Sequence, residues 1–283
     1  MTSWALLTPS FSRDFDRCRL LVESCERYLA PSVKHYLIID ERDAKLFRSL
    51  RSTRTELVLK QDVLPAFLHQ VPFRPKWWWR WSGRPVRGWM VQQIVKLSAD
   101  QFAPEDAYIF ADSDTFFVRP WDPASWIRDG RVPIFREIGP ALRGPMTTSW
   151  FEATSSLLGV GFPEPYQTNY VTSLAVWRRD NLQRLHRALE IGHGAPWQEA
   201  LCPLRTVSEY TLYGLYCDEV LGDEANQYHT DVVPTLNYWP DVALDERSLA
   251  AWSQGLLPQH VMAMVSSRSL TSVTAIRNVF GLA

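Results

Sequence analysis

The stretch from Ala107 to Val118 constrains this chain more than any other. It has the sequence A-Y-I-F-A-D-S-D-T-F-F-V, an apolar strand that ends in two aspartates, Asp112 and Asp114, and then turns apolar again. A strand that is apolar on both sides is typical of the centre of a covered parallel sheet. Ligands of open α/β sheets bind at the carboxyl ends of such strands, where two carboxylates suit a hard divalent cation. The alternative is a polar turn in which an aspartate caps the next segment.

Composition narrows the class of protein. The chain has 283 residues, 46% of them apolar, which is enough for the core of one large α/β domain. Its net charge of -1 argues against a nucleic-acid partner. The four cysteines show no C-x-x-C spacing, and the first fifteen residues lack the pattern of a signal peptide. No stretch approaches the ~18 apolar residues that span a bilayer. We therefore expect a cytoplasmic protein, with peripheral contact to the inner membrane left open.

The order of apolar patterns predicts the fold class. Strands are expected at 4–7, 35–39, 56–59 and 108–111, and helices at 14–29, 44–50 and 88–100. This alternation predicts a mostly parallel central sheet with helices on both faces, a Rossmann-type α/β sandwich. The second half is less regular: it has a loop-rich stretch at 128–161, strands at 170–177 and 261–265, and helices at 180–191 and 206–221. No repeat or low-complexity linker divides the chain, so we expect a single domain over 1–283.

Residues 63–99 form a basic, tryptophan-rich segment without a single acid. It holds six cations and five tryptophans, namely Arg74, Lys76, Arg80, Arg84, Arg87, Lys96, Trp77, Trp78, Trp79, Trp81 and Trp89. Prolines and glycines between 72 and 88 predict irregular structure there. Cations suit a phosphate-bearing ligand, and indole faces suit sugar rings or a membrane interface, so Trp79 and Trp89 are candidate acceptor contacts. The alternative is a surface loop whose tryptophans pack on the core while its cations stay solvated.

The expected helix at 88–97 carries two stripes. Its apolar side holds Met90, Ile94 and Leu97, and its polar side follows helical spacing with Trp89, Gln92, Gln93 and Lys96. A polar stripe is usually solvated. Beside a strand that ends in carboxylates, two glutamines and a lysine also suit the diphosphate and hydroxyl groups of a donor.

Four segments in order carry a family resemblance. They are R-G-W-M-V-Q-Q-I-V-K-L at 87–97, Y-I-F-A-D-S-D-T-F-F at 108–117, N-Y-V-T-S-L-A-V-W-R-R-D-N-L at 169–182 and S-E-Y-T-L-Y-G at 208–214. Together they resemble bacterial glycosyltransferase-like proteins of the GT-A fold. The D-x-D triplet alone is a weak signal, and the ordered set is a stronger one.

The resemblance implies a nucleotide-diphosphate sugar bound through Mn²⁺ or Mg²⁺. Carried onto this chain, Asp114 is the main metal ligand, and Asp112 contacts the metal or the ribose, with Ser113 beside them. Residues at the first two strand ends lie near the nucleoside, namely Thr8, Pro9, Ser10 and Asp40. The nucleotide-binding half then covers about 1–120, and the acceptor-binding half about 121–283.

The sequence departs from the fold's usual pattern at its last strand. Many members add a third metal ligand, often histidine, after a late strand, but 261–265 runs into Ser266-Ser267-Arg268. His260 precedes that strand and is the candidate third ligand, although a lone histidine is more often structural. Arg268 is a candidate for holding the diphosphate, because a guanidinium fork suits phosphate.

Glu209 is the candidate base that would deprotonate an acceptor hydroxyl. It lies in the family-like segment with Tyr210 beside it as an acceptor contact, and Asp218 and Glu219 follow as reserves. The alternative is a carboxylate that only favours the first turn of a helix.

Together these features predict a metal-dependent glycosyltransferase that moves a sugar from a nucleotide-diphosphate sugar to a hydroxyl acceptor. The expected acceptor is a glycan, a lipid-linked group or another glycoconjugate. One alternative is a nucleotidyltransferase on a related sheet, although the loop after the first strand lacks the glycines that such enzymes use to bind phosphate. Another is a non-catalytic carbohydrate-binding protein, which has no need of paired carboxylates at a strand end.

Overall fold

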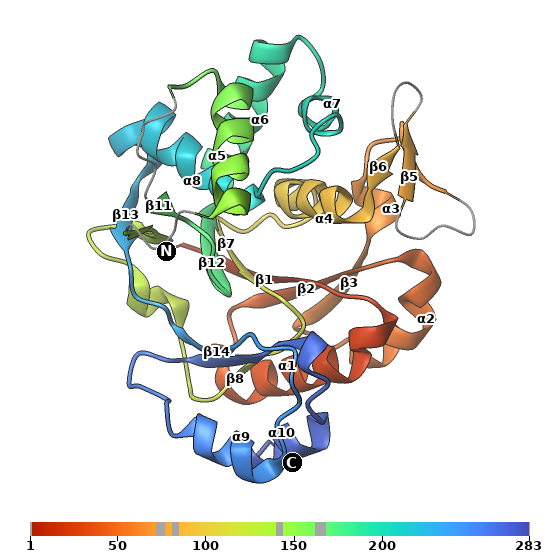
Figure 1. The fold of residues 1–283 in the computed structure, drawn as a ribbon, viewed down its shortest axis with the longest axis vertical. Helices are drawn as coiled ribbons and strands as arrows, with labels where there is room; N and C mark the ends of the chain where they lie inside the picture. Colours follow the sequence, from red (N-terminus) through yellow and green to blue (C-terminus); the bar gives the residue numbers. More distant parts are fainter. Residues whose placement is uncertain (1, 72–76, 81–84, 140–143, 162–167, 283) are drawn as a thin grey trace.

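A computed structural model describes residues 2–71, 77–80, 85–139, 144–161 and 168–282. Its centre is a five-stranded sheet in the spatial order β12 (Leu174–Arg178), β7 (Ala107–Ala111), β1 (Trp4–Pro9), β2 (Lys34–Ile39) and β3 (Thr55–Leu59). β7, β1, β2 and β3 run parallel, and β12 pairs antiparallel with β7 (Figure 1). The predicted mixed α/β fold with a mostly parallel central sheet is therefore confirmed.

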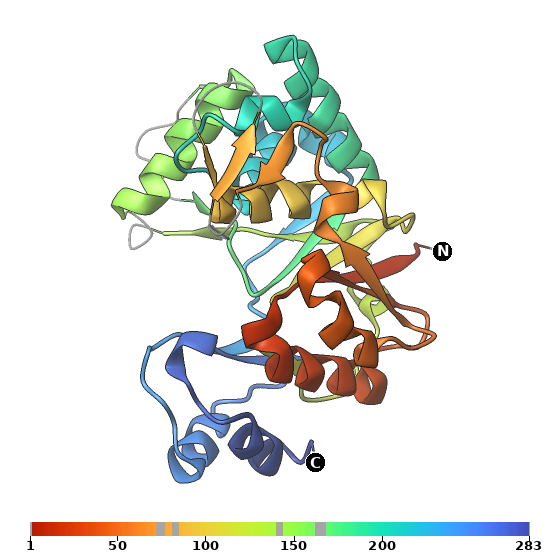
Figure 2. The same ribbon diagram turned by 90° about the vertical axis from the view of Figure 1, so that its right-hand side faces the viewer.

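Helices cover both faces of this sheet, because successive side chains of each strand point to opposite faces. Leu6 on β1 packs with residues of α1 (Phe15–Tyr28), and the apolar side chains of β2 pack with α1 and α2 (Ala44–Phe47) on that face. Leu7 points to the opposite face and joins the core formed with α4 (Gly88–Leu97), α6 (Arg179–His193) and α8 (Glu209–Leu215). Figure 2 shows the sheet as a middle layer between these two groups of helices.

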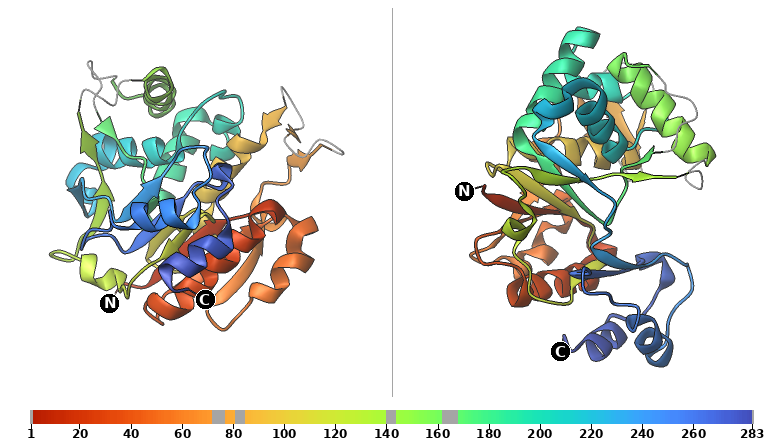
Figure 3. Two further views of the ribbon diagram at one scale, coloured as in Figure 1. Left: turned by 60° about the horizontal axis from the view of Figure 1, so that its bottom comes forward. Right: turned by 90° about the vertical axis from the view of Figure 1, so that its left-hand side faces the viewer.

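A second, smaller sheet begins where β7 ends. Its order is β14 (Thr235–Tyr238), β15 (Met262–Val265) and β8 (Thr115–Phe117). The same α1 packs against β8, and α9 (Glu246–Ser253) with α10 (Val273–Phe280) covers the other side of this sheet through a separate apolar cluster. Figure 3 shows this C-terminal part, in blue, beside the central sheet. The two aspartates at 112 and 114 thus lie at the junction of two sheets.

The tryptophan-rich segment contains strands where irregular structure is expected. α3 (Lys60–Val63) leads into an antiparallel sheet of β4 (Leu68–Gln70), β5 (Trp77–Arg80) and β6 (Val86–Arg87). Along β5, Trp77 and Trp79 are exposed and Trp78 is buried, because successive side chains of a strand point to opposite faces. Residues 72–76 and 81–84, including Trp81, lie outside the described residues.

The stretch 128–161 is more regular than predicted. It contains β9 (Val132–Phe135), β10 (Glu137–Ile138) and α5 (Pro145–Leu158). β10 pairs with β11 (Thr168–Asn169), and β9 pairs with β13 (Gln227–Thr230). The prediction of a loop-rich stretch is wrong because the run of threonines and serines in α5 hides its helical spacing. The proline at the first helical position and Gly159, left-handed at φ 66°, are the end signals that mark this helix.

The remaining predicted elements are close to the observed ones. The strand expected at 170–177 begins later, at Leu174, and α7 (Trp197–Leu201) lies in an unassigned stretch. Ser208 caps α8 by accepting a hydrogen bond from the Thr211 amide, and the helix continues as a π-helix over Tyr216–Leu221. Within the described ranges, no helix is both long and apolar enough to cross a membrane.

Candidate functional site

The carboxyl end of β7 places Asp112 and Asp114 on the junction between the two sheets. The Asp112 carbonyl accepts a hydrogen bond from the Thr115 amide, which turns the chain directly into β8. The Asp114 carbonyl accepts from the Val265 amide at the end of β15, and its carboxylate accepts from the Ser267 amide at 3.0 Å. The side chain of Asp112 is 54% exposed, so one carboxylate is fixed between the sheets and the other faces solvent.

A third carboxylate and an arginine from the start of α1 adjoin this pair. Ser113 donates to the Asp14 carboxylate at 3.4 Å, and Arg17 is buried beside it, donating to the Val265 carbonyl at 2.7 Å. Burial raises the pKa of Asp114 to about 6, with a further contribution from the charge of Asp112. An acid whose charged form is penalised in this way is stabilised by a nearby cation.

Lys96 connects the carboxyl end of β7 to α8. Its buried ammonium group lies 3.3 Å from the Asp112 carboxylate, 3.0 Å from the Glu209 carboxylate and 2.8 Å from the Tyr210 hydroxyl, to which it donates. Burial by itself lowers the pKa of Lys96, but Asp112, Tyr210 and Glu209 outweigh it and hold the pKa well above its usual range. Lys96 is therefore a fixed positive charge that orients Asp112.

The polar stripe of α4 is only partly solvated. Gln93 is buried: its side-chain oxygen accepts from the Glu209 amide at 3.4 Å, and its amide group donates to the Trp89 carbonyl. Because both ends are engaged within the protein, Gln93 does not fit the predicted role in donor binding. Gln92 is half-buried on the same helix and stays a candidate.

Glu209 does not fit the predicted role of acceptor base. Its side chain is 4% exposed, and its carboxylate is paired with Lys96. An acceptor hydroxyl has to reach the base within hydrogen-bond distance, which this burial does not allow in the structure described. Glu209 and Tyr210 instead hold Lys96 in place.

The loops after β1 and β2 lie at the same edge of the sheet as Asp112, since these strands run parallel. Thr8 is fully buried with its hydroxyl 3.0 Å from a ring nitrogen of His35, and Pro9 and Ser10 are also buried. Their side chains are therefore not free to contact a nucleoside, and contacts from this loop would come from its backbone. Asp40 is buried at the next strand end, 3.6 Å from Lys60.

His260 is placed at the wrong end of β15 for the predicted metal site. It precedes the strand and accepts from the Leu257 amide, whereas Asp114 bonds to Val265 and Ser267 at the strand's other end. Arg268 follows Ser267, but its exposed guanidinium pairs with Asp241 at 3.2 Å. The prediction of His260 as a metal ligand is thus wrong on geometry, and Arg268 is near the site only through its backbone.

A cation at this site would be held mainly by Asp112 and Asp114. Across the described ranges, no group of three or more histidine, cysteine, aspartate or glutamate side chains is arranged to hold a metal ion. The two aspartates supply hard oxygen donors, and burial together with the charge of Asp112 raises the pKa of Asp114 despite the nearby Arg17. They fit Mn²⁺ or Mg²⁺ when the other ligands are phosphate oxygens and water.

A second polar cluster, not predicted as such, surrounds Asp218 on the π-helix. Its carboxylate accepts from the Tyr170 hydroxyl at 2.6 Å and lies 2.8 Å from a ring nitrogen of His229 and 3.3 Å from Arg136. Asp218, a reserve candidate for the base, is thus held by three partners within this cluster. The segment that leads from Tyr170 to the start of β12 connects the cluster to the edge near Ala111, since Leu174 pairs with Ala111.

Gly214 is the position that lets Tyr170 pack this closely. A Cβ atom there would lie 2.3 Å from the Tyr170 ring, whereas one at Gly192 in α6 would meet nothing within 4 Å. We expect Gly214→Ala to lower the free energy of unfolding by about 1–3 kcal/mol through overpacking. Gly192→Ala, the matched control, should raise it by about 0.5–1 kcal/mol, because alanine favours a helix. Urea unfolding measures both, and equal effects at the two positions would contradict this packing.

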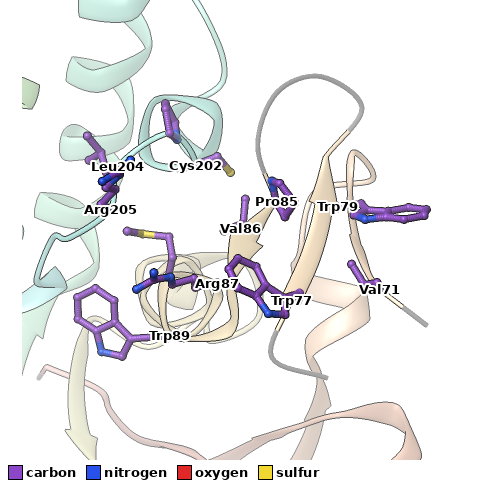
Figure 4. Close-up of a pocket in the computed structure, with 12 residues that line it drawn as sticks. Val71, Trp77, Trp79, Pro85, Val86, Arg87, Trp89, Cys202, Leu204 and Arg205 are labelled. Carbon is purple, nitrogen blue, oxygen red and sulfur yellow. The ribbon is translucent and has the colours of Figure 1, made fainter. Parts of the chain in front are cut away.

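The tryptophan-rich segment forms a cavity of about 580 Å³ at the start of α4 (Figure 4). Two of the predicted acceptor contacts, Trp79 and Trp89, line it and are exposed, whereas Tyr210 is not among its lining residues. Trp89 also heads the helix stripe that ends at Lys96. The structure therefore places Trp89 on the same helix as Lys96, the residue that contacts Asp112.

One known protein family matches nearly the whole length of this fold. The model of a family of unknown function, DUF6492, matches residues 6–265. The chain belongs to DUF6492. The matched range includes Asp14, Lys96, Asp112, Asp114 and Glu209, so the whole charged site of this DUF6492 chain lies within the family's common region. A search of the curated proteins found no match.

Proposed function

We propose that this protein is a metal-dependent glycosyltransferase of the GT-A type that uses a nucleotide-diphosphate sugar. The observation that carries the proposal is the pair Asp112 and Asp114 at the carboxyl end of a buried central strand, with Asp112 oriented by the buried Lys96. The strand order β3-β2-β1-β7-β12 supports it, because it leaves the ends of β1, β2 and β7 side by side for a nucleotide.

In this proposal Asp112 and Asp114 hold Mn²⁺ or Mg²⁺ together with the donor diphosphate. The bound ion supplies a positive charge that stabilises the departing diphosphate. Lys96 fixes the exposed carboxylate of Asp112 beside the bound ion. Glu209 and Tyr210 position Lys96, and Arg17 supports the loop that carries the Ser267 amide to Asp114. Binding then needs little rearrangement, which is the usual basis of electrostatic catalysis.

The acceptor in this proposal is a hydroxyl of a glycan, a lipid-linked group or another glycoconjugate. All four cysteines are free and buried, which supports a reducing, cytoplasmic setting.

Release of nucleoside diphosphate from a panel of nucleotide sugars tests the proposal. We expect at least one donor to be turned over, either by transfer or by slow hydrolysis, when Mn²⁺ is present, and this turnover should stop in EDTA. Lack of release from every common nucleotide sugar, with a hydroxyl-rich acceptor mixture present, would contradict the proposal. Turnover of a nucleoside triphosphate to pyrophosphate would favour the nucleotidyltransferase alternative instead.

A further inference from the structure

The cavity at the start of α4 has the features of a ligand site in its own right. Its volume of about 580 Å³ falls within the usual range of small-molecule pockets, roughly 300–1,000 Å³. Three parts of the chain form it: the β4-β5-β6 sheet, the start of α4 and the loop after α7 (Figure 4). Its lining comprises Val71, Trp77, Trp79, Pro85, Val86, Arg87, Trp89, Met90, Cys202, Pro203, Leu204 and Arg205.

Three indoles of the lining are accessible rather than buried. Trp77 and Trp79 are 38% and 57% exposed on one face of β5, while Trp78 on the opposite face packs into the core. Trp89 is 41% exposed and is held by stacking on Trp150, with the ring centres 6.5 Å apart. Large exposed aromatic groups gathered around one hollow mark an interaction site. Flat indole faces with an N–H group at the edge suit a sugar ring, which offers apolar C–H faces and hydroxyl groups.

The charge of the lining is positive. The Arg87 guanidinium lies over the Trp77 ring, 5.9 Å from its centre. Arg205 lines the cavity from the loop after α7, and both arginine side chains are exposed. Arg80 is close enough to Cys202 to lower the pKa of its thiol, although burial dominates and raises that pKa to about 11. Within the described part of the chain, none of these three arginines forms an ion pair with an acid. Unpaired guanidinium groups recognise carboxylate and phosphate groups by paired hydrogen bonds.

The helix α4 links the cavity to the carboxylate site, because Trp89 lines the cavity and Lys96 contacts Asp112. Trp89 and Lys96 lie on one stripe of this helix, seven residues apart, which corresponds to roughly 10 Å along the helix axis. The cavity therefore lies about two helical turns from the lysine that contacts Asp112.

We propose that this cavity binds an anionic saccharide, a sugar ring carrying a carboxylate or phosphate group, as the recognition end of the acceptor. The assignment to the acceptor rests on the proposed glycosyltransferase activity, whereas binding of the anionic saccharide itself does not. A membrane surface is the less suitable partner, because the indoles line a hollow with Val86 and Met90 inside it instead of projecting from a flat face.

Calorimetric titration of the metal-free protein with trigalacturonate, and with maltotriose as the neutral trisaccharide of similar size, tests the inference. We expect binding of the anionic trisaccharide and at least about tenfold weaker binding of the neutral one. Trp79→Ala and Arg87→Gln should each weaken binding of the anionic trisaccharide about tenfold or more. Trp239→Ala and Arg247→Gln, at exposed positions in the other part of the molecule, should leave it unchanged.

Separate arms of the experiment distinguish the other outcomes. Asp114→Asn should keep trisaccharide binding, so the cavity can be confirmed even if no nucleotide sugar is turned over. Anionic vesicles of phosphatidylglycerol and phosphatidylcholine replace the trisaccharide in a flotation assay. Vesicle binding that requires Trp79 and Arg87, without binding of either trisaccharide, would overturn the inference in favour of a membrane surface. Equal binding of the two trisaccharides would overturn the role of the arginines.

Discussion

Lys96→Met is expected to lower the free energy of unfolding by about 3–5 kcal/mol, the usual cost of removing one partner of a buried ion pair. The change leaves the Glu209 carboxylate, which is 4% exposed, without its positive partner. It also removes the group that orients Asp112. Turnover of the nucleotide sugar should therefore fall together with stability.

A double variant separates the effect of the unpaired charge from the loss of packing. Lys96→Met with Glu209→Gln should regain a large part of the lost stability, because a neutral amide no longer buries an unpaired charge. Lys34→Met is the matched control: Lys34 pairs with Glu56 at 3.7 Å, but both side chains are about half exposed, so a loss of at most about 1 kcal/mol is expected. Chemical unfolding of the four proteins measures these differences. A loss at Lys96 no greater than that at Lys34 would contradict the buried pair.

Asp114→Asn is expected to reduce turnover of the nucleotide sugar by about 10²-fold or more, the scale seen when one preorganised electrostatic contact to a transition state is removed. The fold should persist, because the asparagine side-chain oxygen can accept the same hydrogen bond from the Ser267 amide. Asp231→Asn, at an exposed position after β13, is the matched control and should leave turnover unchanged.

The raised pKa of Asp114 adds a stability signature to this variant. A carboxyl whose pKa rises from 3.8 to about 6 on folding destabilises the folded state above pH 6, where it must be charged. That cost disappears below about pH 4, where the group is protonated in both states. Asp114→Asn should therefore melt at a higher temperature than the parent at pH 8 and at about the same temperature at pH 4. A variant that gains stability and loses turnover is typical of a residue kept for function.

The parts of the fold that were predicted correctly are those with strong local periodicity. Six elements lie near their predicted ranges, because each has a regular apolar pattern over its own length. They are β1, β2, β7, α1, α4 and α6. α5 was missed since its threonines and serines weaken that pattern, and β5 was missed since neighbouring prolines and glycines suggest irregular structure. In both cases the end signals or the partner strands outweigh the local composition.

The partners within the site could not be predicted, because they come from distant parts of the chain. Lys96 and Tyr210 are 114 positions apart, and no local pattern indicates that a helix stripe will meet α8. Glu209 is a candidate base in the sequence because it is a carboxylate in a family-like segment. Its burial beside Lys96 shows that it holds this lysine in place instead. His260 was misplaced because β15 runs antiparallel to β8, so the end of β15, not its start, reaches Asp114. Asp14 and Arg17 were predicted only as parts of a helix start.

The most direct test of the account is the melting temperature of the protein with nucleoside diphosphates, in Mn²⁺ and in EDTA. A ligand at a hundredfold excess over its Kd stabilises the native state by about 2.7 kcal/mol, which corresponds to roughly 5 °C for a chain of this size. We predict such a rise for at least one nucleoside diphosphate with Mn²⁺, little or none in EDTA, and loss of the metal-dependent part in Asp114→Asn but not in Asp231→Asn. An equal rise in Mn²⁺ and EDTA, or an equal rise in Asp114→Asn and the parent, would contradict a metal-linked nucleotide site at Asp112 and Asp114.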